Sequence, residues 1–373
     1  MAAIRKILFS VILAAALEGA ASAKVSLDLV TNYLSQSGKG GPQSYDGSGD
    51  QELTIFEPVL YVNSQIDHNT SLFGSVVYDL LSSASNKAFD TGTGASKGGW
   101  QDRKGVDAGV SKRNGSWMFT PTAGYSTELS YKSLHGGVNV QKFMAEDNFV
   151  LSGGVFYYAD ETKPWNLTAG AFDKFRSKTT RSVNLSATQL LSEREIGLLG
   201  VSYTRQSGYL EGTRNTVYNV SLSTRVAEAM PGEREKYTFT ARYIRSLREN
   251  LALHADYRYY EDSWNIRAHT LEPSVARSFA DEKGALRVFY RLYTQKAAKY
   301  YAHSFATAQP NMTSDSDLAA YTANEAGAQF SYALEDWEAL GMSDWTWGGT
   351  ALYYSRSNNL KAVILQVTLG AKF

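Results

Sequence analysis

The stretch LALHADYRYYED, residues Leu251–Asp262, alternates apolar and polar side chains along its whole length. Successive side chains of an extended chain point to opposite faces. The apolar face carries Leu251, Leu253, Ala255, Tyr257 and Tyr259, and the polar face carries His254, Asp256, Arg258, Tyr260 and Asp262. Such a strand has one face suited to lipid and one suited to water.

The same alternation recurs through residues 24–373, in runs of about ten to fourteen residues separated by turn-forming clusters. Runs of this length exceed the strands of most soluble sheets and approach the length that crosses a membrane at a tilt. A sheet must close on itself in hydrocarbon, because an open edge leaves backbone groups unpaired. The pattern therefore predicts an all-β fold, a transmembrane antiparallel up-and-down β-barrel.

The strand count follows from the parity that single-chain bacterial barrels obey. The chain contains seventeen alternating runs, whereas such barrels have an even number of strands. We assign the run at 214–228 to a long outer loop spanning about 208–235, which leaves sixteen strands, with fourteen and eighteen as the neighbouring alternatives. Short turns are expected near residues 67–69, 113–115, 146–148, 192–195, 247–250 and 280–283, and long outer loops at 36–50, 83–104, 161–178 and 297–321.

The N-terminus has the features of an export signal. Arg5 and Lys6 precede an apolar run, and Ala21-Ser22-Ala23 supplies the small residues of a cleavage site. The alternative, an N-terminal membrane anchor, needs a longer apolar run. We therefore expect a signal peptide over 1–23, a single barrel domain over 24–373, and residence in the cell outer membrane.

Composition removes several classes of function. The 373 residues contain no cysteine, which excludes thiolate metal sites, disulfides and a lipid-modified cysteine. Lys and Arg number 37, as do Asp and Glu, so there is no basic field to attract nucleic acid. We expect no cofactor, and as partners the lipid bilayer and the barrel-assembly machinery. The terminal Phe373, which follows alternating apolar positions, is similar to the assembly signal of outer-membrane barrels.

Two stretches resemble signatures of a known family. Tyr257-Arg258-Tyr259-Tyr260-Glu261-Asp262-Ser263-Trp264 with His269-Thr270-Leu271 forms the first, and residues 291–301, RLYTQKAAKYY, form the second. They identify the chain as a member of an uncharacterised family of bacterial outer-membrane β-barrel proteins, a domain of unknown function. Residues 56–59, 78–85 and 120–128 are similar to further landmarks of the family, so the resemblance spans about residues 51–301. It implies an envelope redox partnership, with a thioredoxin-like protein or a small lipoprotein, and gives no residue a role.

The most informative polar side chains lie on the strands around these stretches, and by strand parity most of them should face the lumen. They are Arg242, His254, Asp256, Arg258, Arg267, His269, Arg287 and Arg291. Guanidinium groups bind carboxylate or phosphate in pairs of hydrogen bonds, so this set could form an anion path. Alternatively, it forms a charged network with Asp256, Glu261, Asp262 and Glu272 that braces the wall, and we favour this second interpretation.

Three other sites receive less support. His254, Asp256 and His269 could join a serine in a hydrolase or hold a metal ion, but no Gly-x-Ser-x-Gly or His-Glu-x-x-His pattern occurs. The loop Pro310–Asp317 has two carboxylates for calcium without the other ligands of a calcium loop, and a solvated loop is the preferred interpretation. Asp90–Gly94 is rich in glycine but lacks the lysine of a phosphate-binding loop.

The sequence thus predicts a non-enzymatic barrel without catalytic or metal-binding residues. It is either a porin-like channel for small anionic solutes or a membrane scaffold for an envelope partner complex, with the wall-borne hydrolase as the alternative. A barrel of this size leaves an interior wide enough for water unless loops enter it, and the loop at 208–235 is the candidate for either a plug or a constriction.

Overall fold

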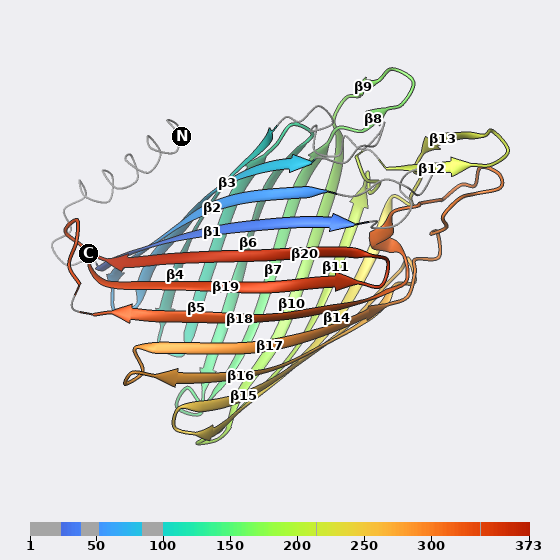
Figure 1. Cartoon of the computed structure of the whole chain (residues 1–373). Coiled ribbons are helices and arrows are strands. Elements are labelled where there is room, and N and C mark those ends of the chain that lie inside the picture. The colour runs from blue at the N-terminus through green and yellow to red at the C-terminus, as the bar shows by residue number, and fades with distance from the viewer. Residues whose placement is uncertain (1–23, 39–51, 84–99, 214, 336) are drawn as a thin grey trace.

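In a computed structural model of the chain, sixteen strands close into one antiparallel barrel (Figure 1). The structure describes residues 24–38, 52–83, 100–213, 215–335 and 337–373. The predicted signal peptide and the Asp90–Gly94 segment lie outside these residues. In the order in which they pair, the barrel strands are β1 (Lys24–Gly38), β2 (Leu53–Asp67), β3 (Thr70–Ser83), β4 (Trp100–Asn114), β5 (Trp117–Thr127), β6 (Tyr131–Met144), β7 (Phe149–Thr162), β10 (Arg176–Ser192), β11 (Glu195–Gly208), β14 (Glu233–Arg248), β15 (Leu251–Asp262), β16 (Arg267–Phe279), β17 (Gly284–Gln295), β18 (Tyr321–Leu334), β19 (Ser343–Arg356) and β20 (Leu360–Lys372).

The predicted sixteen-stranded barrel is confirmed, and the run at 214–228 lies outside it. β12 (Thr216–Asn219) and β13 (Thr224–Ala227) form a separate two-stranded sheet between β11 and β14. A second small hairpin, β8 (Trp165–Asn166) with β9 (Ala171–Phe172), lies between β7 and β10. Both hairpins project from the same end of the barrel (Figure 1).

The connections differ in length at the two ends of the barrel. Turns of two to four residues join β2 to β3, β4 to β5, β6 to β7, β10 to β11, β14 to β15 and β16 to β17, as predicted. The connections at 163–175, 209–232 and 296–320 are long and lie at the other end, and the last contains the short helix η1 (Ser316–Leu318). Barrels of this type have short periplasmic turns and long outer loops. The end with the long connections is therefore the outer end.

The closure of the barrel joins the first strand to the last. β1 pairs with β20 from Ser26 opposite Lys372 to Gly38 opposite Leu360. The backbone N–H of Phe373 donates to the carbonyl of Val25 at 2.8 Å, which continues the pairing to the C-terminus. At the other end of β1, Gly38 has a φ of 114°, and a Cβ there would lie 2.0 Å from the carbonyl oxygen of Asn359. Only glycine fits this closing contact.

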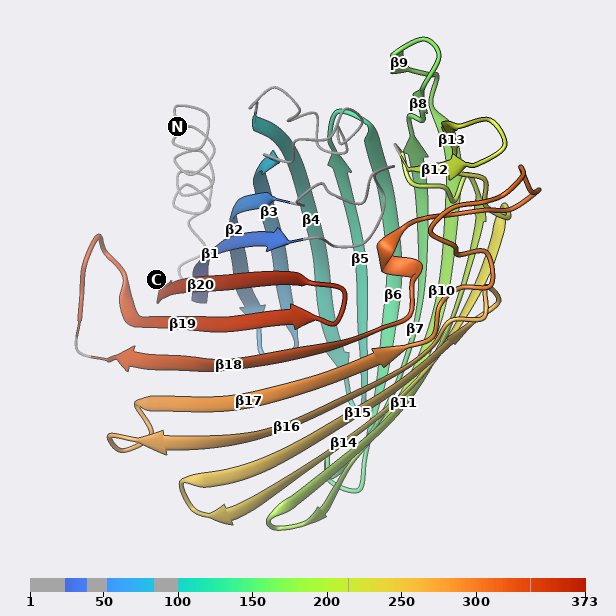
Figure 2. The ribbon, with the colours of Figure 1, turned by 45° about the vertical axis from the view of Figure 1, so that its right-hand side comes forward.

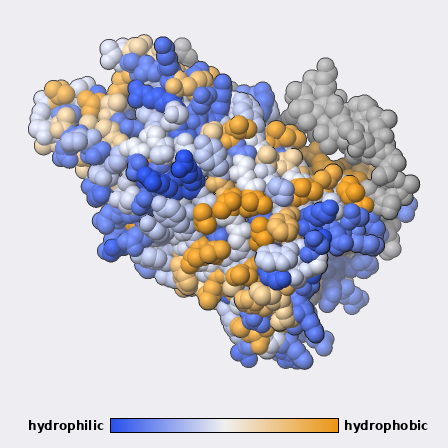
Figure 3. Space-filling view, turned by 180° about the vertical axis from the view of Figure 1, so that it is seen from behind, coloured by the Kyte–Doolittle hydropathy of each residue, from blue (hydrophilic) through white to orange (hydrophobic). Residues whose placement is uncertain are grey.

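The outer wall of the barrel is apolar. Alternate positions place large apolar side chains outward, and Leu199, Val201, Val288 and Val367 are 57%, 54%, 54% and 59% exposed. Figure 3 shows the rear of the barrel, where hydrophobic side chains gather in a band with hydrophilic regions on both sides. Exposed apolar side chains in such a band are stable only against lipid. Together with the closed sheet, the band defines a barrel of the outer membrane.

Buried apolar side chains gather in the outer loops. One cluster joins Met230 and Trp264 to Ile266 and Ala298, and a second joins Val217 to Phe305 and Met312. Each cluster draws residues from loops that are far apart in the sequence. Within the described residues, no helix is long and apolar enough to cross a membrane.

Candidate functional site in the barrel lumen

A row of inward charges crosses the strands from β14 to β18. The register places Arg242 of β14 opposite Asp256 of β15, and Asp256 opposite Glu272 of β16. Arg291 of β17 lies opposite Glu325 of β18. These positions alternate with outward apolar residues such as Leu253, Leu271 and Leu292, so their side chains point into the lumen.

The row is connected by ion pairs. Arg242 pairs with Asp256. Arg287 and Arg291 share Glu272, with contacts of 2.7 and 2.6 Å to its two carboxylate oxygens, and Arg291 also reaches Glu325 at 3.1 Å. The Nε of Arg287 donates to the hydroxyl of Ser274 at 2.9 Å. Each carboxylate of the row therefore has an arginine partner on a neighbouring strand.

The two signs of charge differ in how far they reach into the lumen. The side chains of Asp256, Glu272 and Glu325 are 18%, 11% and 12% exposed, whereas those of Arg242, Arg287 and Arg291 are 52%, 30% and 43% exposed. The carboxylates thus lie against the wall, and the longer guanidinium side chains cover them. The surface that water in the lumen meets is therefore mainly guanidinium.

Arg258 adds a charge to this surface. It points inward from β15, between Thr240 on β14 and Thr270 on β16, and its side chain is exposed. The side chain of Arg258 has no hydrogen bond or ion pair among the residues that the structure describes. The charges of Arg242, Arg287 and Arg291 are balanced by three carboxylates. The fourth arginine, Arg258, therefore gives the luminal set a net positive charge. His254 also points inward, nearer the periplasmic end of the same strand.

Two members of the predicted luminal set lie on the opposite side of the wall. His269 pairs in register with Tyr259, and Arg267 pairs with Glu261, so both face outward. There the hydroxyl of Tyr257 lies 2.8 Å from Nδ1 of His269, and Arg267 pairs with Glu261 at 2.9 Å. The prediction is wrong for these residues because the register with β15 places the odd-numbered positions of β16 outside. They begin the strand at the outer end, beyond the apolar band.

This placement removes the hydrolase and metal interpretations built on the two histidines. His254 faces the lumen and His269 the exterior, so they cannot belong to one site. Among the described residues, no group of three or more His, Asp or Glu side chains is arranged to hold a metal ion.

The sequence interpretation missed the acidic wall across the lumen. Asp28, Glu57, Asp79 and Asp107 point inward from β1 to β4. β3 and β15 are eight places apart in a ring of sixteen strands and so face one another. Arg103 pairs with Asp79 at 3.4 Å, and His135 lies 2.6 Å from Asp107. Strand parity alone does not reveal this wall, because Glu57 shares its face with Ile55 and Val59, and Asp79 shares its face with Val77 and Leu81.

The outer loops narrow the mouth above the arginine wall. Gln295, at the end of β17, donates to the backbone carbonyls of Asp317 and Ala319 at 2.8 and 2.6 Å. Arg356 of β19 pairs with Asp317 at 2.7 Å and lies 3.8 Å from the ring of Tyr321. These strand side chains point inward, so η1 leans against the inside of the rim, beside the outer ends of β19 and β20 (Figure 2).

The loop at 209–232 contributes through Met230, which packs with Tyr260, whereas its hairpin, β12 with β13, projects away from the barrel (Figure 1). The constriction predicted for 208–235 is therefore shared with 296–320.

The loop Pro310–Asp317 is packed, which corrects the expectation of a solvated loop. Thr313, Ser314 and Ser316 are 0%, 1% and 3% exposed. The carboxylate of Asp315 accepts from Asn215 at 2.9 Å, and that of Asp317 from Arg356. The two carboxylates are thus taken up by protein partners, because the loop docks on 209–232 and on the rim.

The carboxyl group of Glu228 lies at the centre of the contact between the two loops. It accepts from the hydroxyl of Thr313, from the backbone N–H of Gly212 at 2.8 Å and from Asn215 at 3.3 Å. Asn215 also donates to Asp315, so the same amide holds two acidic side chains. Burial raises the pKa of Glu228 to about 7, against the lowering by its hydrogen bonds, and the nearby Asp315 raises it further.

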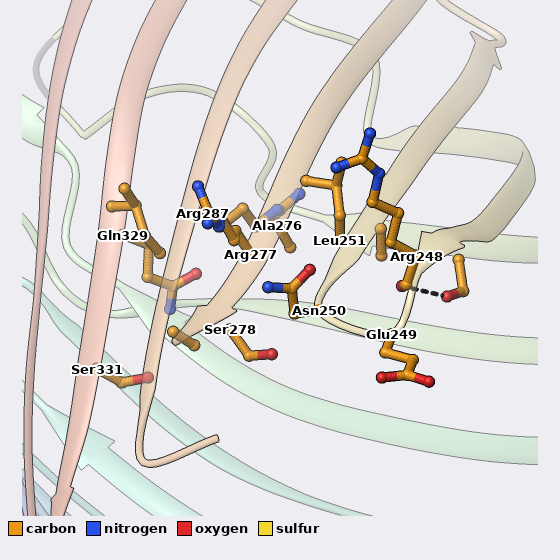
Figure 4. Close-up of a pocket in the computed structure, with 14 residues that line it drawn as sticks. Arg248, Glu249, Asn250, Leu251, Ala276, Arg277, Ser278, Arg287, Gln329 and Ser331 are labelled. Carbon is orange, nitrogen blue, oxygen red and sulfur yellow. Dashed lines mark hydrogen bonds between the residues drawn. The ribbon is translucent and has the colours of Figure 1, made fainter. Parts of the chain in front are cut away.

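A pocket lies beside the luminal Arg287. It lies at the periplasmic ends of β14–β18, and Arg248, Arg277 and Arg287 line it with Gln329 and Asn250. Figure 4 shows these polar side chains gathered beside the turn that joins β14 to β15. By register Arg277 lies opposite Leu251 and Leu286, and Arg248 lies opposite Leu251, so both point to the outer face. Of the three arginines, Arg287 alone belongs to the luminal surface.

The closed sheet, the apolar outer band and the charged lumen define a transmembrane β-barrel of the outer membrane. Within this class, the chain belongs to the family described as "Protein of unknown function (DUF3570)", whose model matches residues 96–370. This confirms the family that the sequence predicted. No curated protein matches the sequence.

Among solved structures, the chain is similar to barrels of the outer membrane. A bacterial polysaccharide outer membrane secretin matches with a TM-score of 0.49 and 10% identity, over 94% of this chain and 98% of that one. OccK2 of Pseudomonas aeruginosa gives 0.45 and 8%, over 95% and 98%. A loop-deletion mutant of OmpT of Vibrio cholerae gives 0.45 and 10%, over 94% and 99%.

Proposed function

We propose that this barrel is a channel that conducts small anionic solutes across the outer membrane. The observation that carries the proposal is the unequal reach of the luminal charges, since guanidinium groups cover the carboxylates that pair with them. An anion passing this wall meets exposed donors and is kept from the acids behind them.

The acidic wall opposite supports a directed path. Carboxylates on β1–β4 repel an anion, whereas the arginines on β14–β17 attract it, so the field across the lumen moves an anion to one side. Arg258, which has no carboxylate partner among the described residues, lies on that side.

Solute flux into proteoliposomes tests the proposal. We expect a small monocarboxylate to enter vesicles that contain the purified barrel faster than an amine of the same size. Equal rates for the two solutes, at a rate above that of empty vesicles, would leave a water-filled pore without the proposed selectivity. No flux of either solute would exclude a channel.

A scaffold for an envelope partner is the second candidate, and one observation favours it. The connection between β18 and β19, residues 335–342, is the longest at the periplasmic end of the described chain. It exposes Trp337 and Leu340, which are 49% and 85% exposed. A thioredoxin-like protein or small lipoprotein, the partners that the family resemblance implies, would meet this surface. Replacement of both residues by serine should abolish capture of such a partner and leave solute flux unchanged.

A further inference from the structure

The outer face of the barrel carries basic side chains just beyond its apolar band. On β7, β10 and β11 the band ends with Val155, Val183 and Val201, which are 50%, 45% and 54% exposed. The next outward positions towards the outer end include Tyr157, Tyr203 and Arg181. Aromatic side chains at this level mark the border between hydrocarbon and headgroups. Arg181 therefore lies where the headgroups of the outer leaflet begin.

Two arginines stand side by side at this border. The register places Arg181 of β10 directly opposite Arg205 of β11, and both point outward. Arg205 pairs with Glu233 at 2.9 Å. The side chain of Arg181 has no hydrogen bond, ion pair or ring contact in the described chain. Like charges directly opposite on neighbouring strands destabilise a sheet, and more so where water is scarce. An anion from outside the protein would remove this repulsion.

Two lysines continue the basic surface towards the outside. The Nζ atoms of Lys132 and Lys163 lie 4.6 and 4.5 Å from the centre of the same Phe175 ring. Lys132 points outward from the outer end of β6, opposite Glu161 of β7. Phe175 precedes β10, six residues before Arg181, which is about 20 Å along an extended chain. The cationic groups thus form a strip over the outer ends of β6–β11, the wall that faces the viewer in the rear view of Figure 3.

The charges on this strip are not balanced by the protein. The nearby outward carboxylates are Glu161, Glu233 and Glu235, and Glu233 is bound to Arg205 while Glu235 accepts from the hydroxyl of Tyr203 at 3.0 Å. Glu161 lies opposite Lys132 in register, so the four cationic groups of the strip face three carboxylates, and no carboxylate contacts Arg181 in the described chain. Further around the barrel, by contrast, the outward Arg267 is neutralised by Glu261.

We propose that the strip formed by Lys132, Lys163, Arg181 and Arg205 binds the phosphate groups of an outer-leaflet glycolipid. Arg181 and Arg205 would hold a phosphate at the membrane border, since guanidinium groups bind phosphate through paired hydrogen bonds. The lysines would hold a second anionic group farther out. The length of the strip suits a phosphorylated sugar headgroup better than the shorter headgroup of a glycerophospholipid.

Retention of lipid by the full chain in detergent, measured by native mass spectrometry, tests this site. The probe is lipid A that carries two phosphates, compared with the same lipid after removal of its phosphates. We expect the wild-type barrel to retain the phosphorylated lipid about tenfold more than the dephosphorylated one, as the loss of charge-assisted hydrogen bonds implies. Arg181→Gln and the double variant Lys132→Gln, Lys163→Gln should each lose most of this preference.

Arg245→Gln is the matched control. Arg245 also points outward, but at the periplasmic end of β14, where it lies 3.7 Å from Glu195. This variant should retain the lipid as the wild type does. Each variant is first shown to be folded by its heat-dependent shift in electrophoretic mobility. Equal retention of the two lipids by the wild type would overturn the proposal, as would unchanged retention by both strip variants. Displacement of the lipid by millimolar inorganic phosphate would assign the site to a free anion instead.

Discussion

At the scale of single residues, three arginines of the lumen form ion pairs with carboxylates of the wall, and a fourth forms none in the described chain. Arg287 and Arg291 are tied to Glu272, so their removal would expose a poorly solvated carboxylate as well as remove a charge. Arg258 has no such ion pair within the described residues. It is therefore the residue at which selectivity can be changed without a change in stability.

Substitution Arg258→Gln tests this separation. We expect the ratio of anion to cation permeability to fall about two- to threefold, because one unpaired charge leaves the luminal surface. The free energy of unfolding should stay within about 0.5 kcal/mol of the wild type. Reversal potentials in asymmetric salt measure the first and urea titration the second. An unchanged permeability ratio would remove Arg258 from the path.

The carboxylates that the arginines cover should affect the free energy of unfolding. Glu272→Gln leaves Arg287 and Arg291 without their shared partner, and we expect a loss of about 2 kcal/mol in the free energy of unfolding. This is less than for a fully buried pair, because both guanidiniums reach water. Glu261→Gln is the matched control: its partner Arg267 lies on the outer face, and the expected loss is below about 1 kcal/mol. Equal losses in the two variants would contradict a bracing role for Glu272.

The sequence predicted the inward face of β14, β15 and β17 but not that of β16. In RAHTLEPSVARSF, Arg267 and His269 share a face with Leu271 and Val275. Polar residues on that face are tolerated because they lie beyond the apolar band, where the outer face meets water and headgroups. Only the pairing with β15 fixes which face is inside, and this register depends on a turn that the sequence does not specify.

At the scale of elements, two long loops form one folded unit over the mouth. Val217 is fully buried against Phe305 and Met312, and the backbones of Ala229 and Met312 exchange hydrogen bonds of 3.1 and 2.7 Å. The sequence predicted both loops from their length but not their contact, because the two segments are about eighty residues apart. The carboxylates of Asp315 and Asp317 suggested calcium, whereas their partners, Asn215 and Arg356, come from other elements.

The docking of these loops should depend on pH through Glu228. Its pKa is about 7 when docked and near its ordinary value of 4.5 when released, so the docked state binds more protons between these values. Docking is therefore strongest below pH 4.5 and weakens as the pH rises to about 7, by up to about 3 kcal/mol. Hydrogen exchange of the Met312 amide, corrected for its intrinsic rate, should show more protection at pH 5 than at pH 8.

Glu228→Gln provides the control for this dependence. An amide of the same shape does not ionise in this range, so the protection of Met312 should become nearly independent of pH. A wild-type protection that rises from pH 5 to pH 8 would contradict the account. A pH dependence that is kept in the variant would assign it to another group, such as Asp315.

At the scale of the whole molecule, alternation along the chain was enough to predict the barrel. The period of two recurs along the barrel strands, and the even strand number excluded the run at 214–228, whose hairpin is not part of the barrel sheet. What the sequence could not predict is the distribution of sign around the lumen. It depends on which strands stand opposite one another, and so on closure between β1 and β20.

The distribution of charge across the lumen is the basis of the proposed function, and single-channel recording tests it most directly. Purified mature protein is placed in a planar bilayer, and the reversal potential is measured with salt of unequal concentration on the two sides. The account predicts stable openings whose reversal potential is that of an anion-selective pore. A folded barrel that shows no openings, or openings selective for cations, would contradict it.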